Sequence, residues 1–248
     1  MGILNATPDS FYDGGAYDDL FTRAQKMIEE GADIIDIGGE STRPGAAVVE
    51  LEEEAARVIP LLKEIKISYP AVKISVDTYK PQLAQMAAEN GADILNDPSG
   101  LADEQMAAVA AKYNKKIVLM HTKGTPQNMN SLAVYDDMLK EMSDFFEEKI
   151  KIITDHGVKV EDIILDPGFG FAKNKEQNLF LLKNLSYFKK FGLEFLVALS
   201  RKRFLSAYEG QGPEDRLQAT LQANLSAVKQ GADILRVHDV AETVKFLS

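Results

Sequence analysis

The chain has 248 residues, of which 45% are hydrophobic, and this is sufficient for one sizeable core. Its formal net charge of −10 disfavours polyanionic partners, so we expect neither nucleic acid nor an acidic membrane surface as a ligand. The absence of cysteine excludes disulfides, thiolate catalysis and cysteine-ligated metal sites. The chain starts with no secretory signal pattern, and no apolar run approaches the roughly 20 residues that span a bilayer, so we expect a cytoplasmic protein.

Short apolar runs alternate with segments of helical periodicity along the whole chain. The expected strands are 2–5, 33–37, 73–77, 93–96, 116–121, 162–166, 194–200 and 233–238. Helices are expected between them, including one over about 18–30, a long one over about 132–156 and a short closing one over 240–247. Gly-Ala-Asp recurs at Gly31, Gly91 and Gly231, between a helical segment and an apolar run, where glycine suits the left-handed cap that ends a helix.

This alternation indicates a parallel sheet built from βα units. A doubly wound open sheet would alternate in the same way, but its functional residues gather at one switch point. Here a polar or charged residue stands at or next to the end of each of the eight expected strands, Asp36 in the second, as in a barrel whose active site lies at the carboxyl ends of its strands. No linker or charge block divides the sequence. We therefore predict an α/β fold, a (β/α)8 TIM barrel that residues 1–248 form as a single domain.

The third, fourth and sixth strands end in Asp77, Asn96 and Asp166. Two carboxylates and an amide at one end of a barrel can accept hydrogen bonds from the amino and ring N–H groups of a ligand. A carboxylate forms a bidentate pair with an N–C(NH2)–N edge, which is typical of guanine- and pterin-type rings. Any one of the three could instead cap a helix or begin a turn. The three together favour a binding site.

Basic residues follow the seventh strand in this otherwise acidic chain. The run Ser-Arg-Lys-Arg occupies positions 200–203, and Arg236 and His238 lie on the next strand, a combination that favours phosphate or diphosphate binding. A solvated basic run is the alternative, and Lys202 could also act as a Schiff-base lysine. Asn5 ends the first strand and could ligate Mg2+ beside a substrate diphosphate, or be a plain turn residue. The loops 5–15 and 38–45 have the composition of mobile lids.

Eight segments together resemble the successive motifs of bacterial dihydropteroate synthases. They are MGILNATPDSF, DIGGESTRPGA, ISVDTYKP, GADILNDPSG, VLMHTKGTP, DPGFGF, SRK and LRVHDV, and they occur in the family's order over essentially the whole chain. The resemblance implies a pterin-binding (β/α)8 barrel. It implies that (7,8-dihydropterin-6-yl)methyl diphosphate condenses with 4-aminobenzoate in folate biosynthesis, with release of diphosphate. It also implies Mg2+, a homodimer, and an aminobenzoate pocket that sulfonamides target.

The same resemblance assigns roles to individual positions. The residues implied around the pterin ring are Asp77, Asn96, Met120, Asp166, Phe171, Lys202 and Arg236. Those implied at the aminobenzoate are Thr42, Arg43, Pro44, Lys202 and Arg203. Those implied at the diphosphate are Asn5, Arg236 and His238, with Asn5 also on the metal. The implied catalytic set is Asp13, Arg43, Asp77, Asp166 and Lys202. His121 receives no role, and we expect it to be structural.

The chain departs from the family pattern at several positions. Thr122 stands where an apolar residue is common, Ala172 and Ser206 where glycine is common, and Arg203 where serine is common. Arg203 could therefore alter contacts to aminobenzoate or to sulfonamides. Family members usually carry a further segment before MGILN, so we expect the approach to the first strand to be trimmed. The alternative functions are a pterin-dependent methyltransferase domain, which needs a corrinoid partner, and a catalytically silent pterin-binding protein.

Overall fold

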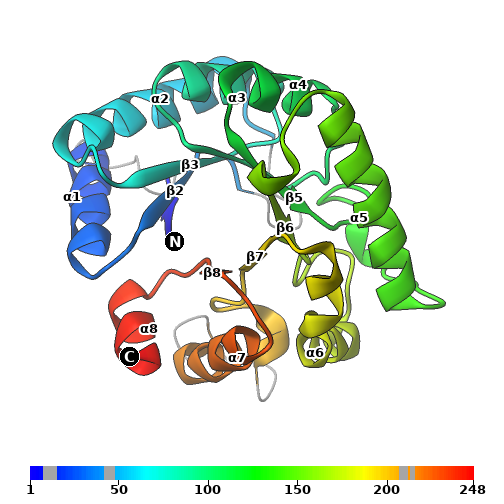
Figure 1. Ribbon diagram of the computed structural model, residues 1–248. Helices are drawn as coiled ribbons and strands as arrows, with labels where there is room; N and C mark the ends of the chain where they lie inside the picture. The colour runs from blue at the N-terminus through cyan, green and yellow to red at the C-terminus, as the bar shows by residue number, and fades with distance from the viewer. Residues whose placement is uncertain (8–15, 42–47, 207–211, 213–215) are drawn as a thin grey trace.

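The computed structural model describes residues 1–7, 16–41, 48–206, 212 and 216–248 (Figure 1). The described residues form a sheet of eight parallel strands whose spatial order is their order in the chain. The strands are β1 (Gly2–Asn5), β2 (Ile34–Gly38), β3 (Lys73–Asp77), β4 (Ile94–Asp97), β5 (Lys116–Met120), β6 (Ile163–Asp166), β7 (Glu194–Val197) and β8 (Ile234–Leu235). The predicted α/β fold with a parallel sheet is confirmed.

Helices alternate with these strands and lie around the outside of the curled sheet (Figure 1). They are α1 (Ala16–Glu29), α2 (Leu51–Ser68), α3 (Pro81–Glu89), α4 (Gln105–Tyr113), α5 (Met138–Asp155), α6 (Lys175–Lys183), α7 (Leu217–Lys229) and α8 (Val240–Leu247). Four short 3-10 helices accompany them in the described ranges, at Met129–Leu132, Val160–Asp162, Leu185–Phe191 and Arg203–Leu205. None of the helices in the described part of the chain is both long and apolar enough to traverse a lipid bilayer.

The two edges of the sheet meet beside β1. The Ile3 amide donates to the Val237 carbonyl at 2.9 Å, and the Val237 amide donates to the Met1 carbonyl at 3.0 Å. The N-terminal amine also donates to the Leu235 carbonyl at 3.1 Å. Because these bonds run between β1 and the chain just after β8, the sheet curls back on itself and its strand ends form a ring.

Successive side chains along a strand point alternately to the inside of the curled sheet and to the helices, and this divides the core into two layers. Ile35 and Ile37 of β2 pack with the outer helices, whereas Ile34 belongs to a small separate cluster. Successive strand residues point to opposite faces, so this cluster fills the inside of the curled sheet. Its buried members are Ile34, Ile94, Val118, Ile164, Leu196 and Ala198.

Some elements end earlier or begin later than their sequence pattern predicts. β7 stops at Val197 and β8 at Leu235, although apolar residues continue in both segments and Val237 still pairs with Gly2 as an isolated parallel bridge. The long helix α5 begins at Met138, not near residue 132, since the Asp137 side chain accepts a hydrogen bond from the Lys140 amide and caps it. The last residues of these two predicted strands therefore lie in the loops that follow the carboxyl ends of β7 and β8.

Candidate active site

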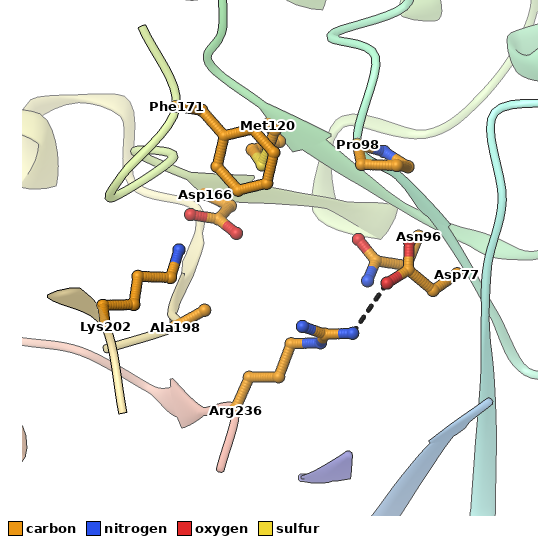
Figure 2. A pocket seen from close by; sticks show the side chains of 9 residues that line it. All are labelled: Asp77, Asn96, Pro98, Met120, Asp166, Phe171, Ala198, Lys202 and Arg236. Atoms are coloured by element: carbon orange, nitrogen blue, oxygen red, sulfur yellow. Dashed lines mark hydrogen bonds and ion pairs between the residues drawn. The ribbon is translucent and has the colours of Figure 1, made fainter. Parts of the chain in front are cut away.

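A pocket opens at the carboxyl ends of β3 to β8 (Figure 2). Its lining residues are Asp77, Asn96, Pro98, Met120, Asp166, Phe171, Ala198, Lys202 and Arg236. The structure therefore brings together all seven residues that the family resemblance implies around a pterin ring. In Figure 2 the Asp166 carboxylate, the Lys202 ammonium and the Arg236 guanidinium point toward the same space. Pro98 and Ala198 also line it, and neither had a chemical signal in the sequence.

The strand period explains why these side chains converge. Four of the strands that line the pocket carry an apolar residue in the inner core layer and, two positions later, a residue on the same face but nearer the carboxyl end. The inner residues of four strands are Ile94, Val118, Ile164 and Leu196, and those two positions later are Asn96, Met120, Asp166 and Ala198. The apolar inner layer therefore forms the floor of the pocket, and the polar side chains lie one layer closer to the carboxyl ends of the strands.

Two carboxylates hold the Arg236 side chain at one side of the pocket. Its Nη2 donates to Asp77 Oδ2 at 2.7 Å (Figure 2). Its Nε donates to Asp36 Oδ2 at 2.6 Å. Asp36 is fully buried and also accepts from Asn96 Nδ2 at 3.4 Å. The Asn96 amide is thereby oriented with its nitrogen toward Asp36. No described residue donates to its Oδ1, which can accept from a ligand N–H.

Asp77 carries an unused acceptor. Its Oδ1 is buried and has no hydrogen-bond partner among the described residues. Burial raises the pKa of Asp77 to about 7, the Arg236 guanidinium acts in the opposite direction, and the Asp36 carboxylate adds to the increase. A buried acceptor without a partner is costly, so the pocket is suited to a ligand that donates hydrogen bonds at this point.

Asp166 and Lys202 face each other across the other side of the pocket. Asp166 Oδ1 accepts from the Gly168 amide at 2.7 Å, and Lys202 Nζ donates to the Phe169 carbonyl. Burial raises the pKa of Asp166, and the Lys202 ammonium opposes that increase. Burial likewise lowers the pKa of Lys202 to about 8, against the effect of Asp166. Lys202 Nζ also lies 4.9 Å from the centre of the Phe171 ring, which supplies an apolar wall.

The side chains of the basic run at 200–203 do not gather in one place, whereas the sequence interpretation treats them as one cluster. Arg201 has a φ of 57°, and this left-handed turn sends its neighbours in different directions. Lys202 lines the pocket, Arg201 Nε donates to Asp239 Oδ2 at 2.9 Å, and Arg203 is exposed. Arg201 therefore ties the β7 end to the start of α8.

The residues implied at the diphosphate lie at the same strand ends. Asn5 ends β1 beside Gly38, which in turn is paired with Asp77. His238 follows Arg236 by two residues, and its Nδ1 lies 3.0 Å from Ser200 Oγ. The described residues contain no group of three or more histidine, aspartate or glutamate side chains that could hold a metal ion. Asp13, Thr42, Arg43 and Pro44 lie outside the described residues.

Sequence reasoning missed two buried residues that support the pocket. Asp36 was recognisable as a polar strand ending but had no role, although it orients Arg236 and Asn96. Lys173 follows the glycine-rich loop and is only 7% exposed, with its Nζ 3.0 Å from His121 Nδ1. No local signal marks such a lysine, because lysine in a loop is ordinarily exposed.

Comparison with known proteins agrees with this geometry. The family model for pterin binding enzymes matches residues 1–238. The dihydropteroate synthase of Synechocystis sp. is 46% identical over 245 residues, which cover 97% of this chain and 84% of that protein.

Solved structures agree as well. A Yersinia pestis dihydropteroate synthase in complex with a sulfonamide drug superposes with a TM-score of 0.94 at 41% identity, covering 100% of this chain and 90% of that one. The Xanthomonas albilineans dihydropteroate synthase with 4-aminobenzoic acid gives a TM-score of 0.92 at 40% identity, covering 100% and 89%. The match over nearly the whole chain, together with the pocket geometry, shows that this chain belongs to the family of pterin binding enzymes.

Proposed function

We propose that this chain catalyses the dihydropteroate synthase reaction. In that reaction (7,8-dihydropterin-6-yl)methyl diphosphate and 4-aminobenzoate give 7,8-dihydropteroate and diphosphate. The observation that carries the proposal is the convergence of Asp77, Asn96 and Asp166 in one pocket with apolar walls. The relatives named above carry this activity in their names, and one neighbouring structure holds 4-aminobenzoic acid. The fold that we infer is one closed (β/α)8 barrel over residues 1–248, supported by the bonds between β1 and Val237.

The pterin ring would bind through its N–H edges. Asp77 Oδ1 and the Asn96 Oδ1 can accept from ring N–H and amino groups, and Asp166 can accept from the opposite part of the ring. Met120 and Phe171 would lie against the flat faces, where aromatic and thioether groups pack well. Arg236, held by Asp36 and Asp77, would face both the ring and the leaving group.

We infer a dissociative mechanism. The bond between the exocyclic CH2 and the diphosphate oxygen breaks first, and the electron pair leaves with diphosphate. The ionised carboxylates of Asp77 and Asp166 would stabilise the positive charge that spreads over the dihydropterin, and Arg236 and His238 would stabilise the departing anion. The aniline nitrogen of 4-aminobenzoate then forms the new C–N bond and loses its proton.

The Asn5 side chain suits a magnesium ion. It makes no hydrogen bond to another described residue, and its amide oxygen is a hard ligand of the kind Mg2+ accepts. Magnesium is usually held by one or two protein groups together with substrate phosphates, so the lack of a carboxylate cluster in the described ranges is compatible with this role. When bound, the ion would neutralise charge on the diphosphate.

The aminobenzoate would bind above the pterin. Thr42, Arg43, Pro44, Lys202 and Arg203 are the proposed binding residues, with Asp13 and Arg43 closing over the reacting groups. Lys202 borders the pterin pocket and could contact both substrates. We also propose that the enzyme acts as a homodimer.

One assay tests the proposal and separates it from its alternatives. Diphosphate release from (7,8-dihydropterin-6-yl)methyl diphosphate is measured with Mg2+, with and without 4-aminobenzoate, and the pterin product is identified by mass. We expect 7,8-dihydropteroate to form in proportion to diphosphate. Pterin binding without release under either condition would favour the silent binding protein. Methyl transfer to a corrinoid partner would favour the methyltransferase.

A further inference from the structure

The buried Lys173 ammonium lies in a cage of acceptors behind the pocket wall. Its Nζ is 3.0 Å from the Gly168 carbonyl, 3.0 Å from the Phe171 carbonyl and 3.3 Å from the His121 carbonyl. The fourth neighbour is His121 Nδ1, at 3.0 Å. All four are acceptors if the imidazole is neutral and protonated on Nε2. An ammonium offers three protons to them and a neutral amine only two, so the cage favours the charged form.

His121 meets this requirement. It is 2% exposed, and its ring packs edge-on against Phe145 with 4.9 Å between the ring centres. Burial lowers the pKa of His121 well below its ordinary value, and the charges of Lys173 and Lys123 lower it further. The ring is therefore neutral, and in the tautomer protonated on Nε2 its Nδ1 accepts from Lys173.

The cage joins two walls of the pterin pocket. His121 directly follows Met120 at the end of β5, whereas Gly168 and Phe171 belong to the loop after β6. The two segments are so close that a Cβ on Gly168, which has a φ of 66°, would lie 2.0 Å from the His121 carbonyl oxygen. From the far side, Asn178 of α6 accepts from the Gly170 amide at 2.7 Å. Lys173 is thus the central donor in a loop that carries Asp166 at one end.

The charge of Lys173 also acts on the pocket. Its surroundings contain the Asp166 carboxylate from β6, the Lys202 ammonium after β7, and Lys123 and His121 after β5. Burial lowers the pKa of Lys173 well below its ordinary value, Asp166 counteracts this, and the charges of Lys202 and Lys123 add to the decrease. Reciprocally, the positive charge of Lys173 lowers the pKa of Asp166, together with Lys202 and Arg236.

We propose that Lys173 is a positioning residue of the pterin site, which fixes the Met120 and Phe171 walls relative to each other. This inference rests on the proposed function, because it takes the pocket as the site of the pterin ring. It also gives His121 a role, as the neutral acceptor that helps to hold the ammonium in place.

The test compares Lys173→Met with wild type and with the matched control Lys183→Met, which changes an exposed lysine on α6. A displaced wall lowers kcat/KM for the pterin diphosphate roughly 10- to 100-fold in Lys173→Met, whereas KM for 4-aminobenzoate stays within about threefold. Lys173→Arg keeps both the charge and a hydrogen-bond donor, so we expect it to retain more of the wild-type kcat/KM for the pterin diphosphate than Lys173→Met does.

Binding of (7,8-dihydropterin-6-yl)methanol, measured by calorimetry, gives a readout that does not require turnover. We expect roughly tenfold weaker binding in Lys173→Met and unchanged binding in Lys183→Met. Wild-type affinity in a folded Lys173→Met would overturn the inference. If Lys173→Met does not fold, Lys173→Gln decides, because it removes the ammonium, and a folded Lys173→Gln with wild-type affinity would also overturn the inference. Failure of wild type and Lys183→Met to form dihydropteroate would instead refute the proposed function.

Discussion

Replacing Asp77 with asparagine is expected to lower activity strongly and yet to remove a loss of stability that the wild type suffers as pH rises toward 7. Burial raises the pKa of Asp77 from 3.8 to about 7. Between these values the folded protein retains a proton that the unfolded chain has lost, so the free energy of unfolding falls as pH rises toward 7. Above pH 7, the full difference between the pKa values of Asp77 in the unfolded and folded states lowers the free energy of unfolding by on the order of 4 kcal/mol.

Asparagine removes this dependence. From pH 5 to pH 8 the wild type should lose roughly 2–3 kcal/mol of stability through Asp77, and Asp77→Asn should not. At pH 8 the free energy of unfolding of Asp77→Asn should exceed that of the wild type by less than this amount. The 2.7 Å charge-assisted bond from Arg236 contributes about 1.5–3 kcal/mol, and an amide oxygen retains only part of it. Arg236 keeps Asp36 as its partner, so no buried charge is left unpaired.

Urea denaturation of both proteins at pH 5 and pH 8 measures the effect. Asp136→Asn serves as the control, since Asp136 is an exposed aspartate before α5. If the free energy of unfolding of Asp77→Asn differed from that of the wild type by the same amount at both pH values, that result would refute the argument. Activity gives a second readout, because kcat/KM of the wild type should fall below about pH 7 as Asp77 takes up its proton. Asp77→Asn should lose roughly 10²–10³-fold in kcat/KM at any pH.

Three further substitutions test separate parts of the molecule. Asp166→Asn should lower kcat/KM roughly 10²-fold or more while the free energy of unfolding changes far less, and normal turnover would contradict the mechanism. Asn224→Leu should raise the free energy of unfolding by about 1–3 kcal/mol, because both amide atoms are buried on α7 without a partner among the described residues. A less stable Asn224→Leu protein would mean that the amide is satisfied by bound water. Arg203→Ser should raise KM for 4-aminobenzoate and weaken sulfonamide inhibition about two- to fivefold, as expected for an exposed charge. Unchanged values of both would exclude Arg203 from the aminobenzoate site.

Local sequence patterns were sufficient to find much of the pocket. Asp77, Asn96 and Asp166 each end an apolar run, and the two-residue period of a strand places them on the inner face. The pterin-binding roles of Met120, Phe171 and Lys202 came from the family resemblance, and these residues line the same pocket. The implied roles of Asp13, Thr42, Arg43 and Pro44 stay predictions, because these residues lie outside the described ranges.

Other features depended on contacts between distant segments. The run at 200–203 looked like one basic cluster, but the left-handed conformation of Arg201 separates its side chains. The burial of Lys173 depends on the approach of the β5 end to the loop after β6, and no pattern near position 173 records it. Asp36 acts through Arg236, which lies 200 residues away in the chain.

The sequence by itself determined the α/β class, the order of strands and helices, and which strand ends carry chemistry, because hydrophobic periodicity and polar strand endings are local properties. Only the tertiary structure decided which charges meet. Closure beside Val237 brings β8 next to β1, and this places Arg236 between Asp36 and Asp77. Ionisation in the pocket follows from that arrangement, since burial and neighbouring charges set each pKa.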